Sequence, residues 1–346
     1  MRARAVGRRR SKRLVAAPPS PFAQALQLAA PAAYILFAIA AVAGNKVFLS
    51  GSSGINAPFF LMTCQAVVAL ACSAAFFATG ATWSGRPLID PPSWQALRRA
   101  LPLGASAVLN TGLGLTALRS MPVPLYGAVR RSGVVVTLAM ETLTGQAPAA
   151  ALSTRTRVAT AVASVLVVVG AAAAAVAQGV RDVPLLGLAL TLTSNVVTAV
   201  NGSLVSALSV GLLDASPTAS RAGPDLKQKR RLAPFTLMFY NAAVMAPLSL
   251  LIALATGELA VLRTMQWSGA TVAYLLLSSV LGICVTVCAF WTTEAFSPLA
   301  SAIAGNIKDV PLLFMPWSDF TPTLLGYAGV ALNLGGSSLF VLARSG

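Results

Sequence analysis

Ten apolar runs of about 20 residues constrain the fold of this 346-residue chain more than any other feature. They cover residues 28–50, 57–79, 100–118, 122–143, 158–177, 183–208, 235–256, 269–293, 298–317 and 323–342. Hydrophobic residues make up 56% of the chain and charged residues only 10%, a balance far from that of a soluble domain. A helix of this length crosses a bilayer with every backbone polar group satisfied internally. The pattern therefore predicts an all-α, polytopic membrane protein with ten transmembrane helices.

The distribution of lysine and arginine predicts the orientation of these helices. If the N-terminus is cytosolic, 18 of the 25 basic residues lie on the cytosolic side, and only Arg119, Arg181 and Arg263 lie on the opposite side. Such an excess is typical of cytosolic loops, and an even number of spans then places both termini in the cytosol. We interpret residues 1–27 as a basic cytosolic tail, 28–213 as the first repeat plus the sixth helix, 214–232 as a cytosolic linker and 233–343 as spans seven to ten.

Several classes of function are excluded by composition. The net charge of +16 is spread over a tail and short loops rather than gathered in a basic domain, so it does not indicate a nucleic-acid partner. The chain has no histidine, which excludes His-based zinc sites and Ser-His hydrolysis. All four cysteines fall inside spans, where packing is their simplest role. We expect no enzyme, no cofactor and no metal. The arginine-rich residues 1–13 leave a transit peptide as an alternative.

Four cations interrupt the apolar runs: Lys46, Arg130, Arg131 and Lys308. An intramembrane cation costs about 2.5 to 3.5 kcal/mol by insertion assays, so it usually faces a wet cavity or an anionic partner. From the helical rise, Lys308 lies roughly 15 Å deep and Arg130 roughly 12 Å deep, entering from opposite sides. The two can therefore approach a common level. Lys46, near the end of its span, has the alternative of reaching outward to the interface.

Internal ion pairing is the alternative explanation for these cations. The acids inside the spans are Glu141 and Asp309, with Glu294 at a helix end. Glu141 is three turns beyond Arg130, and Asp309 points about 100° away from Lys308 on the same helix. Neither acid is placed to neutralise both cationic centres, so the pattern favours a site for an anionic solute.

The two halves of the chain also echo one another. Residues 124–131 begin the fourth span and residues 298–308 begin the ninth, at an offset of 174 residues, and each brings a cation after the same kind of helix start. Duplication of a five-helix unit inverts the second copy in the membrane, because five is odd. We expect two inverted five-helix repeats with a substrate site near the midplane between them. Chance similarity between apolar sequences is the alternative.

Four short motifs carry a resemblance to a known family: Asn45-Lys46 in the first span, residues 125–132 in the fourth, Phe239-Tyr240-Asn241 in the seventh and residues 305–309 (GNIKD) in the ninth. In this order, over residues 28–342, the chain resembles the nucleotide-sugar transporters of the drug/metabolite transporter superfamily, which are related to the triose-phosphate translocators. The fourth-span arginines and the lone ninth-span lysine are similar to those of the UDP-sugar branch.

The resemblance implies roles for individual residues. Tyr240 and Asn241 would hold the nucleobase, and Gly305, Asn306 and Lys308 would approach the ribose, phosphates and sugar. Ala242 stands where the family often has a second asparagine, which favours uracil over guanine. The candidate substrate-binding residues are Lys308, Asn306, Gly305, Tyr240, Asn241, Arg130, Arg131, Asn45 and Lys46. Packing of a polar pair is the alternative for Tyr240 and Asn241.

The implied function is a UDP-sugar/UMP antiporter that moves nucleotide sugar from the cytosol into the Golgi lumen, with membrane lipid as its surroundings. Exchange fits the residues, since an empty carrier with facing cations has a higher barrier than one that holds an anion. The alternatives are a plastid-type sugar-phosphate/phosphate translocator, a general metabolite exporter, and a signalling or scaffold protein. The first is disfavoured because Asp309 stands where that group has arginine. The sequence does not specify which sugar and which base are carried or whether the protein forms a homodimer. The endoplasmic reticulum and the plastid envelope are alternatives to the Golgi as its compartment.

Overall fold

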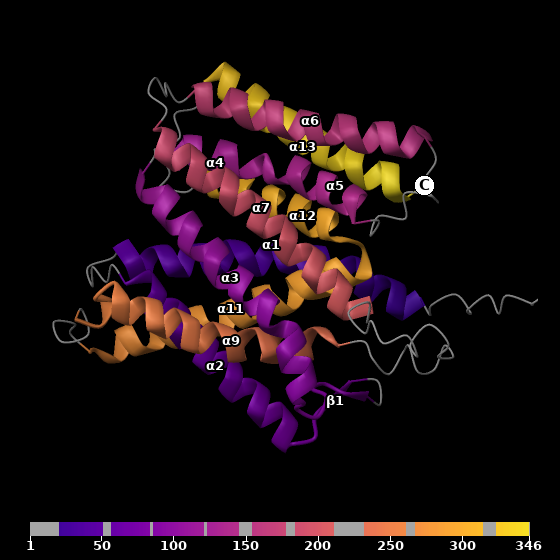
Figure 1. The fold of residues 1–346 in the computed structure, drawn as a ribbon. Coiled ribbons are helices and arrows are strands. Elements are labelled where there is room, and N and C mark those ends of the chain that lie inside the picture. Colours follow the sequence, from indigo (N-terminus) through magenta and orange to yellow (C-terminus); the bar gives the residue numbers. More distant parts are fainter. Residues whose placement is uncertain are drawn as a thin grey trace, which may run out of the picture.

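The computed structural model describes residues 21–50, 57–83, 86–120, 123–144, 154–177, 184–210, 232–260, 267–313 and 323–345. Its α-helices are α1 (Pro21–Ser50), α2 (Pro58–Ala78), α3 (Trp94–Ser120), α4 (Val123–Arg131), α5 (Gly133–Leu143), α6 (Thr154–Ala177), α7 (Leu185–Val210), α9 (Pro234–Ala255), α11 (Gly269–Ala295), α12 (Pro298–Leu313) and α13 (Leu324–Ser345) (Figure 1). A 3₁₀ helix, η2 (Glu258–Ala260), follows α9. Residues 1–20 of the predicted tail and nearly all of the predicted linker lie outside the described residues.

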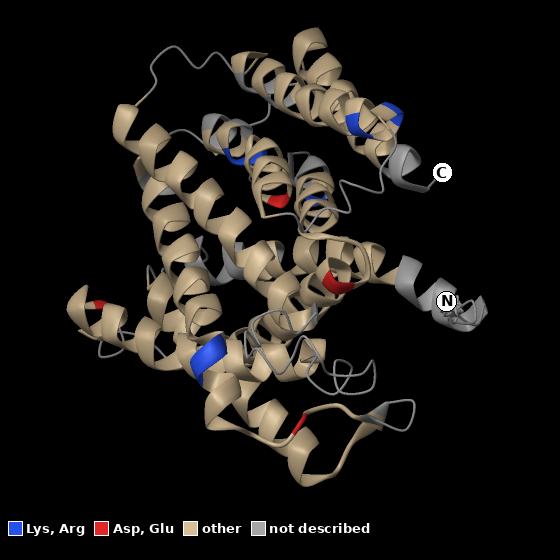
Figure 2. Ribbon diagram, turned by 45° about the vertical axis from the view of Figure 1, so that its right-hand side comes forward, with Lys and Arg blue, Asp and Glu red and all other residues tan. Residues whose placement is uncertain are grey.

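Each predicted span overlaps helical structure in the part of the chain that the structure describes. Five described helices are long and apolar enough to cross a membrane: Pro58–Ala78, Trp94–Ala117, Leu185–Ser209, Pro234–Ala255 and Gly269–Ala295. Charged side chains are sparse and scattered along the ribbon (Figure 2), as the composition requires. The prediction of an almost entirely helical, multi-pass membrane protein is confirmed to this extent, and the number of ten crossings stays a prediction.

The fourth predicted span, residues 122–143, is two helices rather than one. α4 ends at Arg131 and α5 begins at Gly133. At the break, the backbone N–H of Ser132 (3.1 Å) and its hydroxyl (2.7 Å) both donate to the carbonyl oxygen of Val129. Asn195 of α7 donates its Nδ2 to the same oxygen at 2.8 Å. A side chain from a neighbouring helix therefore donates a hydrogen bond at the interruption. A break in a helix is tolerated at membrane depth only where protein surrounds it.

The helices pack mainly in pairs: α6 with α13, α3 with α7, α1 with α11 and α2 with α9. Figure 1 shows α6 and α13 side by side at the top, α2, α9 and α11 at the bottom, and α5, α7 and α12 between these groups. The central helices α5, α7 and α12 contact one another, so the site they enclose lies inside the bundle.

Glycines allow the closest of these contacts. A Cβ atom at Gly170 of α6 would lie 2.5 Å from the carbonyl oxygen of Gly329 in α13. A Cβ atom at Gly336 of α13 would lie 2.7 Å from the carbonyl oxygen of Ala163 in α6. Small residues at a helix interface bring two backbones together, which is a main source of helix association in membranes.

Two short strands are an addition to the all-α prediction. β1 (Thr82–Trp83) pairs antiparallel with β2 (Arg86–Pro87) in the connection from α2 to α3. Threonine and tryptophan favour extended backbone, which the span-based prediction does not consider. Further along this connection, the backbone N–H of Asp90 donates to Thr236 Oγ1 at 3.0 Å. The connection is thereby tied to the start of α9.

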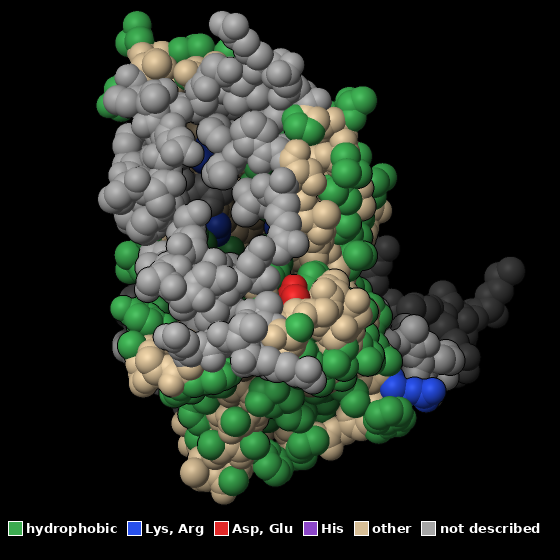
Figure 3. Space-filling view, turned by 90° about the vertical axis from the view of Figure 1, so that its left-hand side faces the viewer, with side chains coloured by type: hydrophobic (Ala, Val, Ile, Leu, Met, Phe, Trp, Pro, Cys, Tyr) green, Lys and Arg blue, Asp and Glu red, His purple; other side chains and the backbone are tan. Residues whose placement is uncertain are grey.

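Apolar side chains cover much of the outer surface. α6 exposes Val158, Val162, Val165 and Val169, which recur at helical spacing on one face. Figure 3 shows hydrophobic side chains widely distributed over one face of the molecule. Monomeric soluble proteins rarely expose contiguous apolar surface of this kind, whereas lipid tails cover it without cost.

Candidate functional site

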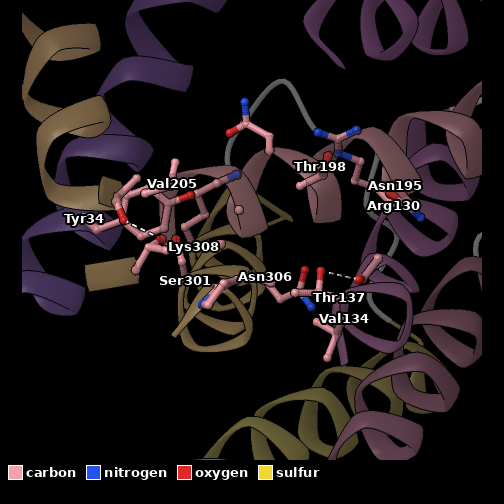
Figure 4. A pocket seen from close by; sticks show the side chains of 18 of the residues that line it. Tyr34, Arg130, Val134, Thr137, Asn195, Thr198, Val205, Ser301, Asn306 and Lys308 are labelled. Atoms are coloured by element: carbon pink, nitrogen blue, oxygen red, sulfur yellow. Dashed lines mark hydrogen bonds between the residues drawn. The ribbon is translucent and has the colours of Figure 1, made fainter. Parts of the chain in front are cut away.

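A cavity of about 240 Å³ lies in the centre of the bundle. Its walls come from Tyr34 of α1, Arg130 of α4, residues of α5, α7 and α11, and the cavity-facing side of α12 (Figure 4). We call it the cationic cavity, because its lining contains Arg130 and Lys308 and, among the described residues, no aspartate or glutamate. The structure thus brings together the two cations whose depths were predicted to match.

Arg130 is held by uncharged groups. Its Nη1 and Nη2 each donate to Asn110 Oδ1 at 3.2 Å, and Nη1 also donates to Ser194 Oγ. Arg130 occupies the last turn of α4, where the helix dipole favours a cation. These neighbours orient the guanidinium without neutralising it. The electrostatic result is a positive charge on the cavity wall.

Asn110 of α3 is the centre of this arrangement, and the sequence analysis missed it. Its Oδ1 also accepts hydrogen bonds from Ser194 Oγ at 2.7 Å and Thr198 Oγ1 at 2.8 Å. Four donor groups therefore converge on one oxygen, which has only two lone pairs. The available signal was the spacing of Ser194 and Thr198, one turn apart within an apolar span, since polar residues inside spans tend to face the interior.

Asn195 and Asn201 of α7 line the cavity beside this cluster and were also missed as site residues. Asn195 bonds to the break between α4 and α5, as described above. Asn201 donates its Nδ2 to Ser106 Oγ at 2.8 Å and to the carbonyl oxygen of Leu103 at 3.1 Å. Gly133 allows Asn195 to come close, because a Cβ there would lie 3.1 Å from Asn195 Oδ1.

Arg131 lies in a different environment from Arg130. Its side chain is 3% exposed and is not among the residues that line the cationic cavity. Adjacent helix residues point about 100° apart, so only one of the pair can face the cavity. The structure assigns that position to Arg130.

α12 contributes Ser301, Gly305, Asn306 and Lys308 to the cavity lining. Asn306 is 7% exposed, and its Nδ2 has no hydrogen-bond partner among the described residues. A buried donor without a partner costs about 1 to 3 kcal/mol, so α12 carries an unsatisfied amide in the wall of the cavity. A Cβ at Gly305 would lie 3.4 Å from the Tyr34 hydroxyl, so the glycine lets α1 and α12 come near each other here.

A second cavity of about 280 Å³ adjoins the first through Lys308, which lines both. We call it the methionine cavity after Met62, Met238 and Met245 in its otherwise mostly aliphatic lining. Asn241 also lines it and is 6% exposed. Its Nδ2 lies 3.0 Å from Met245 Sδ, and its Oδ1 has no hydrogen-bond partner within the described chain. The cavity therefore combines soft apolar walls with a few polar side chains, Gln65, Asn241 and Thr286, beside Lys308.

Tyr240 lines neither cavity. Its side chain is 2% exposed and packs with Ala96 and Ala100 of α3. Its hydroxyl accepts a hydrogen bond from the backbone N–H of Ser93 at 2.8 Å, and its ring meets that of Phe239 edge-on at 5.0 Å. These contacts support the packing alternative for Tyr240, and Asn241 alone of this pair faces a cavity.

The side chains of Asn45, Lys46 and Asp309 lie outside the described residues. Their predicted roles, including the argument that Asp309 disfavours a compact phosphate, stay predictions. The described residues contain no group of three His, Cys, Asp or Glu side chains that could hold a metal ion. All four cysteines are free thiols.

The chain is similar in sequence to a protein from a social amoeba. It is 24% identical over 250 residues to a protein of Dictyostelium discoideum named "Putative UDP-sugar transporter". The match covers 70% of this chain but only 57% of the relative, so the chain spans somewhat more than half of that protein's length. No protein-family model matches the chain.

The fold itself recurs among solved structures. One crystal structure aligns over 93% of this chain and 98% of its own, with a TM-score of 0.56 and 16% sequence identity. The two chains share a fold. At this identity the likeness extends to architecture alone.

Proposed function

We propose that this chain is a nucleotide-sugar transporter of the UDP-sugar type. The observation that carries the proposal is the shared position of Lys308 between two cavities of opposite character. The cationic cavity suits a diphosphate, and its amides and hydroxyls suit a sugar. The methionine cavity suits a flat heterocycle, with the side-chain amide of Asn241 in its lining as a polar group for the base edge. The name of the Dictyostelium relative supports the same substrate class.

A compact sugar phosphate fits this arrangement less well. Such a molecule would use the cationic cavity and leave the methionine cavity empty. A nucleotide sugar has a charged centre between two larger ends, which matches two cavities that meet at a lysine.

The helix contacts support an inverted repeat as the frame for transport. If spans one to five and six to ten are equivalent, α2 pairs with its equivalent α9, α6 with α13, and the α4–α5 unit with α12. The α3–α7 pair then corresponds to the α11–α1 pair. Pairings of this kind follow from a two-fold axis between the halves, where inverted-repeat transporters bind substrate.

In the proposed cycle, nucleotide sugar enters from the cytosol and nucleoside monophosphate returns from the Golgi lumen, with both termini cytosolic. Strict exchange follows from charge. Arg130, which is held by uncharged groups, carries a desolvation cost when both ends of the cavity are closed, and a bound phosphate lowers it. Return of the empty carrier is therefore slow.

Uptake into liposomes tests the proposal. Purified protein is reconstituted into liposomes preloaded with UMP, GMP, CMP, AMP or inorganic phosphate, and uptake of a panel of labelled nucleotide sugars and of triose phosphate is measured. We expect uptake of UDP-sugars that depends on internal UMP. Uptake of triose phosphate against internal phosphate, without uptake of any nucleotide sugar, would overturn the proposal.

A further inference from the structure

Two buried glutamates join distant parts of the chain in the same way. Glu141, 1% exposed near the end of α5, accepts a hydrogen bond at Oε1 from the backbone N–H of Leu299 at 2.6 Å. Glu258, 8% exposed just after α9, accepts one at Oε2 from the backbone N–H of Phe60 at 2.9 Å. Each donor belongs to the first turn of a helix from the other half of the molecule, α12 and α2 respectively.

The starts of α12 and α2 leave room for such a carboxyl group. Each helix begins with a proline, Pro298 and Pro58, which has no N–H, so the amides that follow are the first to need an acceptor. In α12, Ser297 Oγ accepts a hydrogen bond from the backbone N–H of Ala300 at 3.1 Å, and Glu141 accepts the one from the backbone N–H of Leu299. The positive end of the helix dipole also favours a carboxylate at this position.

The Glu141 bond lies at one end of the cationic cavity. Thr137 of α5 lines the cavity, and Glu141 follows one turn later on the same face. Pro298, next to Leu299, lines it from α12. The bond thus joins two walls of the cavity. Figure 1 shows α5 toward the right of the molecule, whereas Figure 3, seen from the left, shows Lys or Arg side chains inside a hollow.

We propose that Glu141 is a positioning residue that holds the first turn of α12 against α5 and so closes this end of the cationic cavity. The proposal rests on the proposed transport function, because alternating access requires one end to close while the other is open. It deepens that function by naming a contact that must break before the cavity opens toward α5. Since α12 also carries Asn306 and Lys308, its release would reorient part of the binding surface.

A reporter cysteine measures this closure directly. Ser301 lines the cavity at the start of α12, so Ser301→Cys is introduced into the full chain after the four native cysteines are replaced by alanine. The protein is reconstituted into liposomes, and a membrane-impermeant thiol reagent is applied from outside or trapped inside. With Glu141 present, we expect modification predominantly from one side.

Glu141→Ala is expected to raise the rate of modification from the protected side about 10- to 150-fold, the factor that corresponds to a hydrogen bond to a charged group. Glu141→Gln keeps the accepting oxygen without the charge and is expected to give an intermediate rate, and it serves as the readout if the alanine variant does not fold. Glu258→Ala removes the other glutamate bond, away from the cationic cavity, and is the matched control.

An unchanged protected-side rate in both Glu141 variants would overturn the proposal. An equal rise in Glu258→Ala would also overturn it, because general loosening would then explain the result. The assay contains no nucleotide, so its outcome is separate from the transport assay. A protein that carries no nucleotide sugar, but in which Glu141→Ala exposes the reporter, would refute the proposed function and leave the role of Glu141 intact.

Discussion

Both terminal nitrogens of Arg130 share the single side-chain oxygen of Asn110, each at 3.2 Å. An aspartate in place of Asn110 has the same shape and adds a negative charge at this distance. Two opposite unit charges about 4 Å apart attract by about 4 kcal/mol at an effective dielectric constant of 20. We therefore expect Asn110→Asp to weaken pyrophosphate binding at least about tenfold. The rise in melting temperature that pyrophosphate produces in the wild type and in the variant measures the effect.

Asn110→Ser is the matched comparison, because it removes the shared acceptor without adding charge. Its loss of pyrophosphate binding is expected to be smaller than that of Asn110→Asp. If the aspartate variant bound pyrophosphate as the wild type does, Arg130 would not be the anion-binding group.

Arg130→Ala and Arg131→Ala are expected to differ in kind. Only Arg130 lines the cationic cavity, so its loss removes a charge-assisted bond to phosphate worth about 1.5 to 3 kcal/mol, or about 10- to 150-fold in UMP affinity. Arg131 is buried, so its loss is expected to lower thermal stability with little change in UMP affinity. Calorimetric titration with UMP and a melting curve for each variant separate the two effects. Equal, mild losses of affinity would contradict this assignment.

Lys308→Ala is expected to abolish exchange while the protein still inserts and folds. Lys308 lines both cavities. Its removal therefore affects the diphosphate of the substrate whichever cavity holds the base and whichever holds the sugar. Protection by UMP and protection by pyrophosphate are both expected to be lost. Ser301→Ala on the same helix changes the cavity lining without changing its charge and is the control. Exchange near the wild-type rate in Lys308→Ala would contradict the role of this lysine.

Asn241→Ala is expected to affect the base alone. Asn241 lines the methionine cavity and its Oδ1 has no hydrogen-bond partner among the described residues, and leaving a base donor without a partner costs about 1 to 3 kcal/mol, roughly five- to 150-fold in affinity. Protection by UMP should therefore weaken, whereas inhibition of exchange by pyrophosphate should stay nearly unchanged. Intact UMP protection would count against base binding in this cavity.

Gly336→Ala tests the contact between α6 and α13. The new Cβ would meet the carbonyl oxygen of Ala163 at 2.7 Å, so the backbones must separate, at a cost of about 1 to 3 kcal/mol. Gly335→Ala is the matched control, since a Cβ there meets nothing within 4 Å. The melting temperature in detergent should fall for Gly336→Ala only. A similar melting temperature for both variants would show that this contact is not tight.

The helices and the presence of Arg130 and Lys308 in the lining of one cavity could be predicted from sequence, because both depend on properties along the chain. Apolar run length locates a span, and helical rise converts residue number into depth. The break at Ser132 could not be predicted in this way, because the bond from Asn195 comes from a helix far along the chain. Nothing local in residues 122–143 shows that such a partner is present.

The roles of individual polar residues depended on contacts that periodicity does not describe. Tyr240 and Asn241 are adjacent in sequence, but the Tyr240 hydroxyl meets a backbone amide in the connection before α3, and Asn241 turns toward a cavity. Asn110 is one amide in a long apolar helix, and its importance appears only once α3, α4 and α7 are assembled.

The glutamate bonds also bear on how the chain divides. A cut between α7 and α9 would place Glu141 on the N-terminal fragment and its donor Leu299 on the C-terminal one. It would place Glu258 on the C-terminal fragment and its donor Phe60 on the N-terminal one. Each fragment would then hold one donor and one acceptor that only its counterpart completes. Each fragment would therefore need the other to complete its glutamate hydrogen bond, and neither fragment alone would contain a complete one.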